Sequence, residues 1–154
     1  MKDHIRDYAT DAFRFYAMNG KSAEKYKQKI YIETLESIKK KEETFIKSGI
    51  SKPTEQAIIK ADEAVVERMS EILDMEAVDK VLAEFDVRRK VINRAIEIVY
   101  FTDADKELEA GDIKSRVTKA SIEIHADERS VYRWLKQARE LFAYQRGLRI
   151  KKTS

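Results

Sequence analysis

Apolar side chains recur every three or four positions along most of the chain, which is the spacing of amphipathic α-helices. The pattern is clearest in residues 112–146, where two helical stretches are separated by a break at His125. We expect Asp112 to cap the first and Asp127 the second, because an Asp side chain accepts from the free N–H groups of a first helical turn. The predicted buried positions are Ile113, Val117, Ala120 and Ile124, then Val131, Trp134, Leu135, Ala138, Leu141 and Phe142.

Earlier segments follow the same period. Residues 2–18 predict an aromatic-rich helix whose rings fill a core or an oligomer interface; stacking on nucleic-acid bases is disfavoured because its acids equal its bases. Asn19-Gly20 ends it, and a helix of residues 22–46 follows, closed by the break at Ser48–Pro53. Residues 54–85 form a further stripe, with a kink expected near Asp74–Glu76 where its phase shifts, and residues 85–101 a last helix before the 112–146 pair.

Composition supports an all-α fold. One Pro and four Gly leave little material for the frequent turns of a β-sheet protein, and no Cys is present for disulfides or thiolate metal sites. The long stripe of residues 54–85 needs a partner, which is either the 22–46 helix in a helical hairpin or a second copy in a homodimer. We therefore expect a coiled-coil-like assembly or oligomerisation region at 1–82, a trihelical helix-turn-helix domain at 83–148 and a basic tail at 149–154.

Positive charge is concentrated near the C-terminus. Residues 112–154 hold 11 Lys and Arg against 5 Asp and Glu, a net of +6, whereas residues 1–111 hold 20 against 23, a net of −3. Such asymmetry is typical of a surface that contacts nucleic acid. It is also compatible with an ordinary solvated helix face, since any amphipathic helix has a polar side.

Arg129 and Arg133 favour the nucleic-acid interpretation. They lie four residues apart on the polar face of the second helix, and an Arg fork matches guanine O6 and N7 in a major groove. Other side chains are expected to contact phosphates or base edges beside them. The complete predicted DNA-binding set is Arg129, Ser130, Tyr132, Arg133, Lys136, Gln137, Lys114, Arg116 and Lys119.

The run Glu128-Arg129-Ser130-Val131-Tyr132-Arg133-Trp134-Leu135-Lys136-Gln137-Ala138-Arg139 resembles the last helix of region 4 of RNA polymerase sigma factors. It is more closely similar to the sigma-like regulators of Firmicute phages and prophages that activate late genes, and residues 89–101 resemble the helix leading into that motif. The resemblance spans about residues 84–148. It implies transcription regulation through double-stranded DNA and contact with host RNA polymerase. Two alternatives remain: a small terminase-like packaging subunit, and a helical adaptor that binds no DNA.

The sequence contains no pattern that supports catalysis. His4 and His125 are its two histidines, and phosphate-loop, dinucleotide and zinc-protease motifs are absent. The alternating acids of residues 103–109 lack the glycine and the bidentate Glu of a calcium loop, so we expect a solvated linker there. We therefore expect no enzyme activity, no catalytic residue, no metal and no cofactor. Because acids occupy the N-terminus and no 18-residue apolar run occurs, we expect a cytoplasmic protein without a membrane span.

Overall fold

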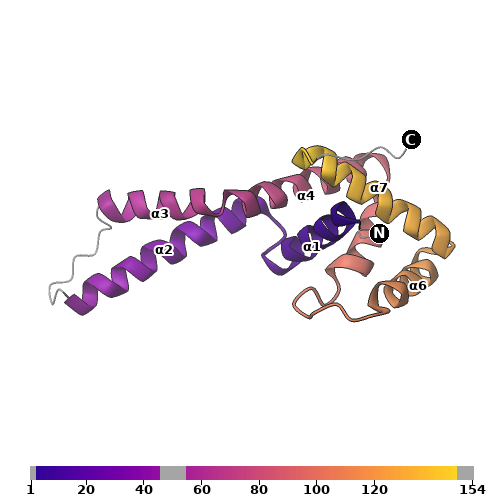
Figure 1. Ribbon diagram of the computed structural model, residues 1–154, viewed down its shortest axis with the longest axis horizontal. Helices are drawn as coiled ribbons and strands as arrows, with labels where there is room; N and C mark the ends of the chain where they lie inside the picture. Colours follow the sequence, from indigo (N-terminus) through magenta and orange to yellow (C-terminus); the bar gives the residue numbers. More distant parts are fainter. Residues whose placement is uncertain (1–2, 46–54, 149–154) are drawn as a thin grey trace. The chain divides into compact units, whose positions relative to one another are not determined.

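The computed structural model describes residues 3–45 and 55–148, and within these ranges the regular structure is entirely helical, which confirms the predicted all-α class (Figure 1). The expected turn at Ser48–Pro53 and the basic tail at 149–154 lie outside the described residues. The helices are α1 (His4–Met18), α2 (Ala23–Phe45), α3 (Glu55–Glu67), α4 (Met69–Arg88), α5 (Lys90–Ile96), the π-helical η1 (Glu97–Phe101), α6 (Asp112–Ile124) and α7 (Glu128–Arg146).

The contacts divide the chain into two compact units. The main unit comprises Met1–Ser22 and Asp74–Ser154, and the hairpin unit comprises Ala23–Leu73. This division differs from the expected boundary between residues 82 and 83. The reason is that α1 packs against α7 and η1, and the second part of α4 belongs with them. Residues 1–22 are therefore part of the same compact unit as the expected C-terminal domain.

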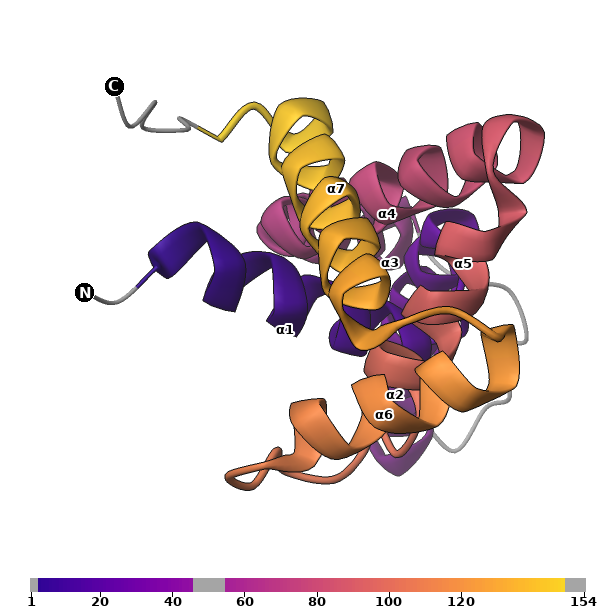
Figure 2. The same cartoon turned by 90° about the vertical axis from the view of Figure 1, so that its right-hand side faces the viewer.

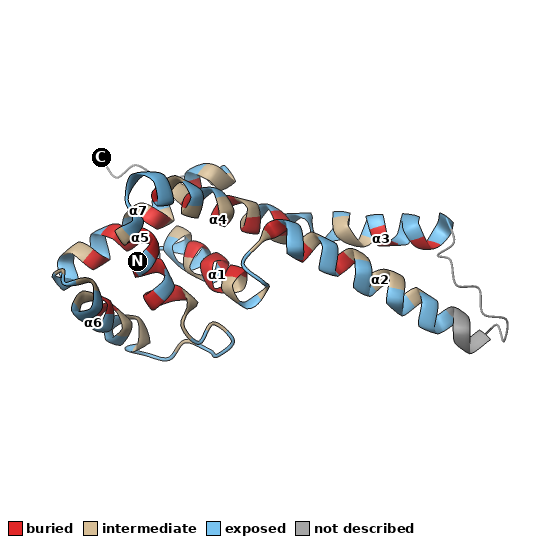
Figure 3. Ribbon diagram, turned by 180° about the vertical axis from the view of Figure 1, so that it is seen from behind, coloured by how far each residue is buried: buried red, intermediate tan, exposed pale blue. Residues whose placement is uncertain are grey.

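An aromatic cluster fixes α1 in the main unit. The Phe13 side chain is fully buried, stacks on Tyr100 of η1 with ring centroids 5.4 Å apart, and lies 5.8 Å from the Phe142 ring of α7. Figure 3 shows buried positions on α1, α5 and α7 and exposed residues on their outer sides. The prediction that the aromatic residues of α1 enter a core is therefore confirmed for Phe13 and Tyr16.

Two aspartates of α4 bind side chains from the first and last helices. Asp74 accepts from the Tyr8 hydroxyl at 2.7 Å and pairs with the Arg146 guanidinium at 2.7 Å. Asp79 accepts from the Tyr16 hydroxyl, also at 2.7 Å. Burial raises the pKa of Tyr16, and the hydrogen bond to Asp79 and the charge of that carboxylate raise the pKa further. The neutral phenol is therefore the form that the fold stabilises.

The Tyr16 environment predicts a loss of stability in alkali. Because the folded pKa lies above the unfolded value of about 10, Tyr16 stabilises the fold fully below pH 10, and this stabilisation is lost as the pH rises toward the folded pKa. We expect Tyr16→Phe to flatten the fall of the unfolding free energy between about pH 9 and pH 12 in urea titrations. Tyr144→Phe, at a 76% exposed ring, is the matched control. If the unfolding free energy fell equally with pH in Tyr16→Phe and in the unchanged chain, Tyr16 would not be the source of the alkaline instability.

Helix breaks fall at different places from those expected. The stripe of residues 54–85 is interrupted at Arg68, between α3 and α4, and α4 runs without interruption through Asp74–Glu76, where the kink was predicted. The expected helix of residues 85–101 is likewise divided, because Arg89 adopts φ −154° and ψ 84° between α4 and α5. The phase shift near residue 74 instead coincides with the boundary between the two compact units.

The acidic loop of residues 102–111 is attached to α1 through Arg14. This arginine is 7% exposed, and its Nη2 donates to the backbone carbonyls of Asp103, Ala104 and Lys106. Burial is the main cause that lowers the pKa of Arg14, and the positive charge of the neighbouring Arg116 lowers this pKa further. Most acidic side chains of the loop are exposed, as expected for a solvated segment, but its backbone is held by a buried cation that sequence analysis did not identify.

The hairpin unit consists of α2, α3 and the first residues of α4. Helices α2 and α3 pack against each other, and the Tyr26 hydroxyl of α2 donates to the Glu71 carboxylate and accepts from Arg68 at 3.3 Å. Burial raises the pKa of the Tyr26 phenol, and the hydrogen bond to Glu71 raises it further. Of the two partners proposed for the 54–85 stripe, the 22–46 helix is therefore in contact with it within one chain.

Candidate nucleic-acid interface

Helices α6 and α7 are joined by the short segment His125–Asp127, and Figure 2 shows the two helices with this connection between them. The α6 helix ends at His125, whose φ of 60° is in the left-handed region that glycine adopts more easily. Asp127 then begins α7, and its Oδ1 accepts from the Ser130 N–H at 2.7 Å. This confirms the predicted cap at Asp127. The predicted cap at Asp112 is wrong, because Gly111 occupies the N-cap position of α6.

Asp112 instead closes the preceding loop. Its Oδ2 accepts from the Glu109 N–H at 2.8 Å, so the carboxylate points back toward the loop instead of forward over the α6 turn. Gly111 has φ 87°, which an L-residue adopts only with strain. A glycine followed by an acid is therefore used here to turn the chain into α6, and the acid holds the turn.

The inner face of α7 is apolar, as its periodicity predicted. The predicted residues Val131, Trp134, Leu135, Ala138 and Phe142 are buried, and Leu141 is half-buried. On α6, Val117 and Ala120 are buried, whereas Ile113 and Ile124 are half-buried. Helix α7 contacts α1, α5 and α6, so the orientation of its outer face is fixed by three helices.

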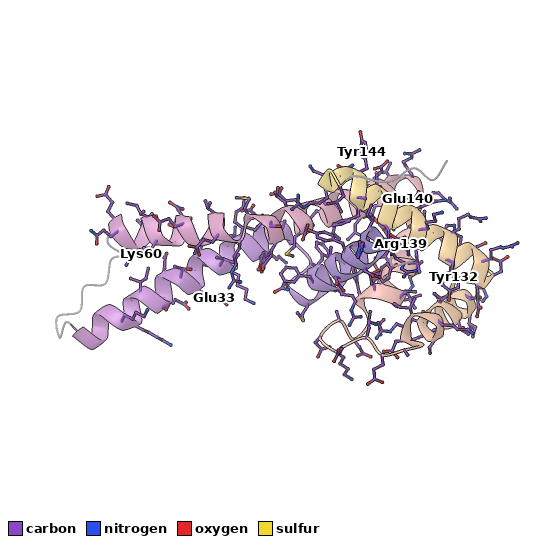
Figure 4. All side chains as sticks on the ribbon, viewed as in Figure 1. Glu33, Lys60, Tyr132, Arg139, Glu140 and Tyr144 are labelled. Carbon is purple, nitrogen blue, oxygen red and sulfur yellow. The ribbon has the colours of Figure 1, made fainter. Side chains whose placement is uncertain are left out.

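The outer face of α7 carries the two predicted base-contacting arginines. Arg129 and Arg133 are exposed, and among the described residues neither guanidinium lies within 4.0 Å of a carboxylate. The Arg133 Nη2 donates to the Ser130 hydroxyl at 3.4 Å, which is a weak contact. Tyr132 is 43% exposed, Lys136 is exposed, and Ser130 and Gln137 are half-buried. Figure 4 labels Tyr132, Glu140 and Tyr144 along the same helix.

The three predicted residues of α6 have different environments. Lys114 and Lys119 are exposed, and Lys119 lies 3.9 Å from Glu123 one turn further along. Arg116 is half-buried, and its Nη1 donates to the backbone carbonyl of Val99 at 3.2 Å. This hydrogen bond links Arg116 of α6 to η1.

Basic residues near the C-terminal end of α7 are also used internally. Arg139 donates to the Tyr100 hydroxyl at 2.8 Å, and Arg146 pairs with Asp74. The exposed positive charge of α6 and α7 is consequently carried by Lys114, Lys119, Arg129, Arg133 and Lys136. Surface pairs of the kind formed by Lys136 with Glu140, at 4.0 Å, contribute little to stability and separate readily when a phosphate competes.

Asp127 contributes a negative charge at the beginning of α7. Hydrogen bonds from Ser130, with smaller contributions from the charges of Arg133 and Arg129, lower the pKa of this carboxyl. The carboxylate therefore occupies the N-terminal end of α7 itself.

Two exposed large hydrophobic residues of α6 and α7 were not in the predicted set. Tyr144 is 76% exposed on α7, two helical turns beyond Gln137, and Ile122 is 68% exposed on α6. The helical period alone places Tyr144 on the same side of α7 as Arg133 and Glu140, so the sequence contained the information needed to include it.

A cation–π contact joins Arg89, the residue before α5, to Trp134 of α7. The Arg89 guanidinium lies 6.0 Å from the Trp134 ring centroid, which is within the range of such contacts. Arg89 itself is exposed, and it precedes the first residue of α5. The contact therefore adds a further link between α5 and α7 beside their apolar packing.

The described residues were compared with the requirements of a metal site and of a membrane-spanning helix, and they meet neither. No three His, Cys, Asp or Glu side chains within 3–45 and 55–148 are grouped so that they could hold a metal ion. No helix in these ranges combines the length and apolar character required to cross a bilayer.

Comparison of the chain with protein-family models, with curated proteins and with solved structures gave no match.

Proposed function

We propose that this chain is a sequence-specific DNA-binding transcription regulator of the phage or prophage type, similar to sigma region 4. In this proposal α6, residues 125–127 and α7 act as a helix-turn-helix, and the first half of α7 enters a major groove. The observation that carries the proposal is the state of Arg129 and Arg133. Both are exposed on the outer side of α7, one turn apart, and within the described residues neither guanidinium lies within 4.0 Å of a carboxylate.

Each exposed side chain has a distinct role in the proposed complex. Arg129 and Arg133 contact guanine edges, because the planar fork of Arg donates two parallel hydrogen bonds to O6 and N7. Ser130, Tyr132, Lys136 and Gln137 contact neighbouring base edges or phosphates. Lys114 and Lys119 contact the phosphate backbone, which positions the protein without specifying sequence. Arg116 is a positioning residue through its bond to Val99. Contact with host RNA polymerase is part of the proposal through the sigma resemblance.

A second candidate function is a small terminase-like DNA-packaging subunit. The observation that favours it is the separate hairpin unit, which exposes several large apolar side chains of α2, α3 and α4. Such a surface is able to pair copies of a chain, as a packaging ring requires. The two functions differ in the number of copies and in sequence preference, both of which are measurable.

Selection of duplexes from a random pool by the purified full chain tests the proposal. We expect one enriched sequence, bound about 10³-fold or more tightly than a scrambled duplex at physiological salt. We also expect log affinity to fall linearly with log salt concentration, because bound phosphates release their counterions. Absence of binding at low salt would favour the adaptor, and binding by a many-copy ring without sequence preference would favour the packaging subunit.

A further inference from the structure

Two neighbouring arginines lie at the corner where α4 ends and α5 begins. Arg88 and Arg89 are both exposed, and Val87 beside them is 87% exposed. Arg88 pairs with Glu84 at 2.9 Å. Within the described residues the Arg89 guanidinium does not lie within 4.0 Å of a carboxylate. The two arginines therefore share residue type and exposure but differ in whether an ion pair uses their charge.

Arg89 lies beside α7, the helix of the proposed DNA contact. Its guanidinium is 6.0 Å from the Trp134 ring centroid, and α5 and α7 pack against each other (Figure 2). A guanidinium over an aromatic ring is held in place by the ring, while the N–H groups at its edge still donate hydrogen bonds. Arg89 is therefore positioned on whichever flank of α7 contains Trp134.

Trp134 lies at the border between the buried and the outer side of α7. Successive residues of a helix are rotated by about 100°, so the buried Val131 and Ala138 lie about 40–60° from Trp134 in one direction. The half-buried Ser130 and Gln137 lie about 40–60° from it in the other direction. The order of burial thus agrees with the helical geometry. Arg89 is beside the flank that leads from the core to the outer face.

This flank of α7 carries no charge of its own. The residues of α7 rotated by about 40–140° from Val131 on the Trp134 side are all uncharged: Ser130, Trp134, Gln137, Leu141, Tyr144 and Gln145. Lys136 lies about 140° from Val131 on the opposite side. A cation on the Trp134 flank must therefore come from another element, and Arg89 is such a cation.

The dimensions of a duplex indicate what Arg89 contacts. A helix with its side chains is about 10–12 Å across, and the major groove is about 12 Å wide. When a helix lies in the groove, the two sugar–phosphate backbones consequently run along its two flanks. An uncharged flank neutralises no phosphate, whereas a guanidinium beside it donates to phosphate oxygens.

We propose that Arg89 is a phosphate-binding residue that contacts the DNA backbone along the Trp134 flank of α7. This inference rests on the proposed function, because it requires α7 in a major groove. Arg89 adds affinity for duplexes of any sequence, whereas Arg129 and Arg133 select the sequence. Trp134 is a positioning residue that holds the Arg89 guanidinium.

Arg89→Met tests the contact, because it removes the charge but keeps a long side chain over the Trp134 ring. We expect affinity for the selected and the scrambled duplex to fall by the same factor, and the slope of log affinity against log salt concentration to decrease by about 0.9. Arg88→Met, whose parent charge is paired with Glu84, is the matched control and leaves affinity and slope unchanged. Fluorescence of Trp134, the one Trp of the sequence, checks that the packing is retained.

Duplexes with single phosphates replaced by uncharged methylphosphonates test whether the effect is a direct contact. We expect one or two replacements to weaken binding of the unchanged chain and of Arg88→Met, yet to have no further effect on Arg89→Met, because both changes remove the same interaction. A change of packing alone would instead leave every replacement with its full effect in Arg89→Met, and this result overturns the proposal.

The failure of this contact and the failure of the proposed function give different results. If Arg133→Ala lowers discrimination while Arg89→Met changes neither affinity nor salt dependence, the proposed function stands and the Arg89 contact is wrong. A loss in Arg89→Met that is confined to the selected duplex also overturns the proposal, since a phosphate contact does not depend on sequence. If the unchanged chain binds no duplex at low salt, both proposals are wrong.

Discussion

Phe13→Ala is expected to lower the free energy of unfolding of the main unit by about 3–5 kcal/mol, the usual cost of removing a buried phenyl ring. Phe13 has no exposed surface, and its ring contacts Tyr100 and Phe142 from two different segments of the chain. Neither neighbour is able to fill the space without leaving its own packing. Urea denaturation followed by circular dichroism measures the change, and we expect the thermal midpoint to fall by on the order of 10 °C.

Met18→Ala is the control for this prediction. Met18 is in the same helix but is 54% exposed, so its truncation should change the unfolding free energy by no more than about 0.5 kcal/mol.

The burial of Phe13 and Tyr16 also predicts that a chain shortened to residues 83–154 fails to unfold cooperatively, because it lacks both side chains. A stable, cooperatively folding 83–154 fragment would show that α1 is dispensable and that the main unit is smaller than its contacts indicate.

Arg133→Ala is expected to lower discrimination between the selected duplex and a scrambled one by about 1–3 kcal/mol, while helicity stays unchanged. The side chain is exposed and makes one weak contact with Ser130, so its loss removes no packing from the folded chain. Affinities for the two duplexes at several salt concentrations measure the effect. Equal losses on both duplexes would mean that Arg133 contacts only phosphates.

Two further variants separate the shape of the Arg133 side chain from its charge. Arg133→Lys keeps the charge but removes the planar fork, so we expect discrimination to fall while binding to scrambled DNA and its salt dependence are retained. Arg88→Ala removes an exposed arginine of α4 that pairs with Glu84 at 2.9 Å, in the same unit but outside the proposed interface. We expect it to leave discrimination unchanged, which controls for a general loss of positive charge.

Local features of the fold followed from the sequence. The apolar period of residues 131–142 identified the buried side of α7, and the Asp127 cap was predicted correctly because both depend on residues within a few positions of one another. The exposure of Arg129 and Arg133 follows from the same period. The helical class followed from the scarcity of Pro and Gly.

Features that depend on contacts between residues far apart in the sequence could not be predicted from the local pattern. The assignment of α1 to the main unit requires Phe13 to meet Tyr100 and Phe142, and nothing in the local pattern of residues 4–18 selects those partners. Arg116 is basic like most of the predicted DNA-binding set, and its hydrogen bond to the Val99 carbonyl, which lies 17 residues away in the sequence, could not be predicted from the local pattern. The break at Arg89 contains neither Gly nor Pro, so the pattern of residues 85–101 continued through it.

The most direct measurement of the central proposal is a nuclear magnetic resonance titration of the ¹⁵N-labelled full chain with the selected duplex. We expect the largest shifts at the backbone amides of residues 129–137 and at the side-chain Nε–H groups of Arg129 and Arg133, with smaller shifts at Lys114 and Lys119 and none in the hairpin unit. Shifts confined to the hairpin unit, or an α7 whose signals do not move while DNA binds, would contradict the account.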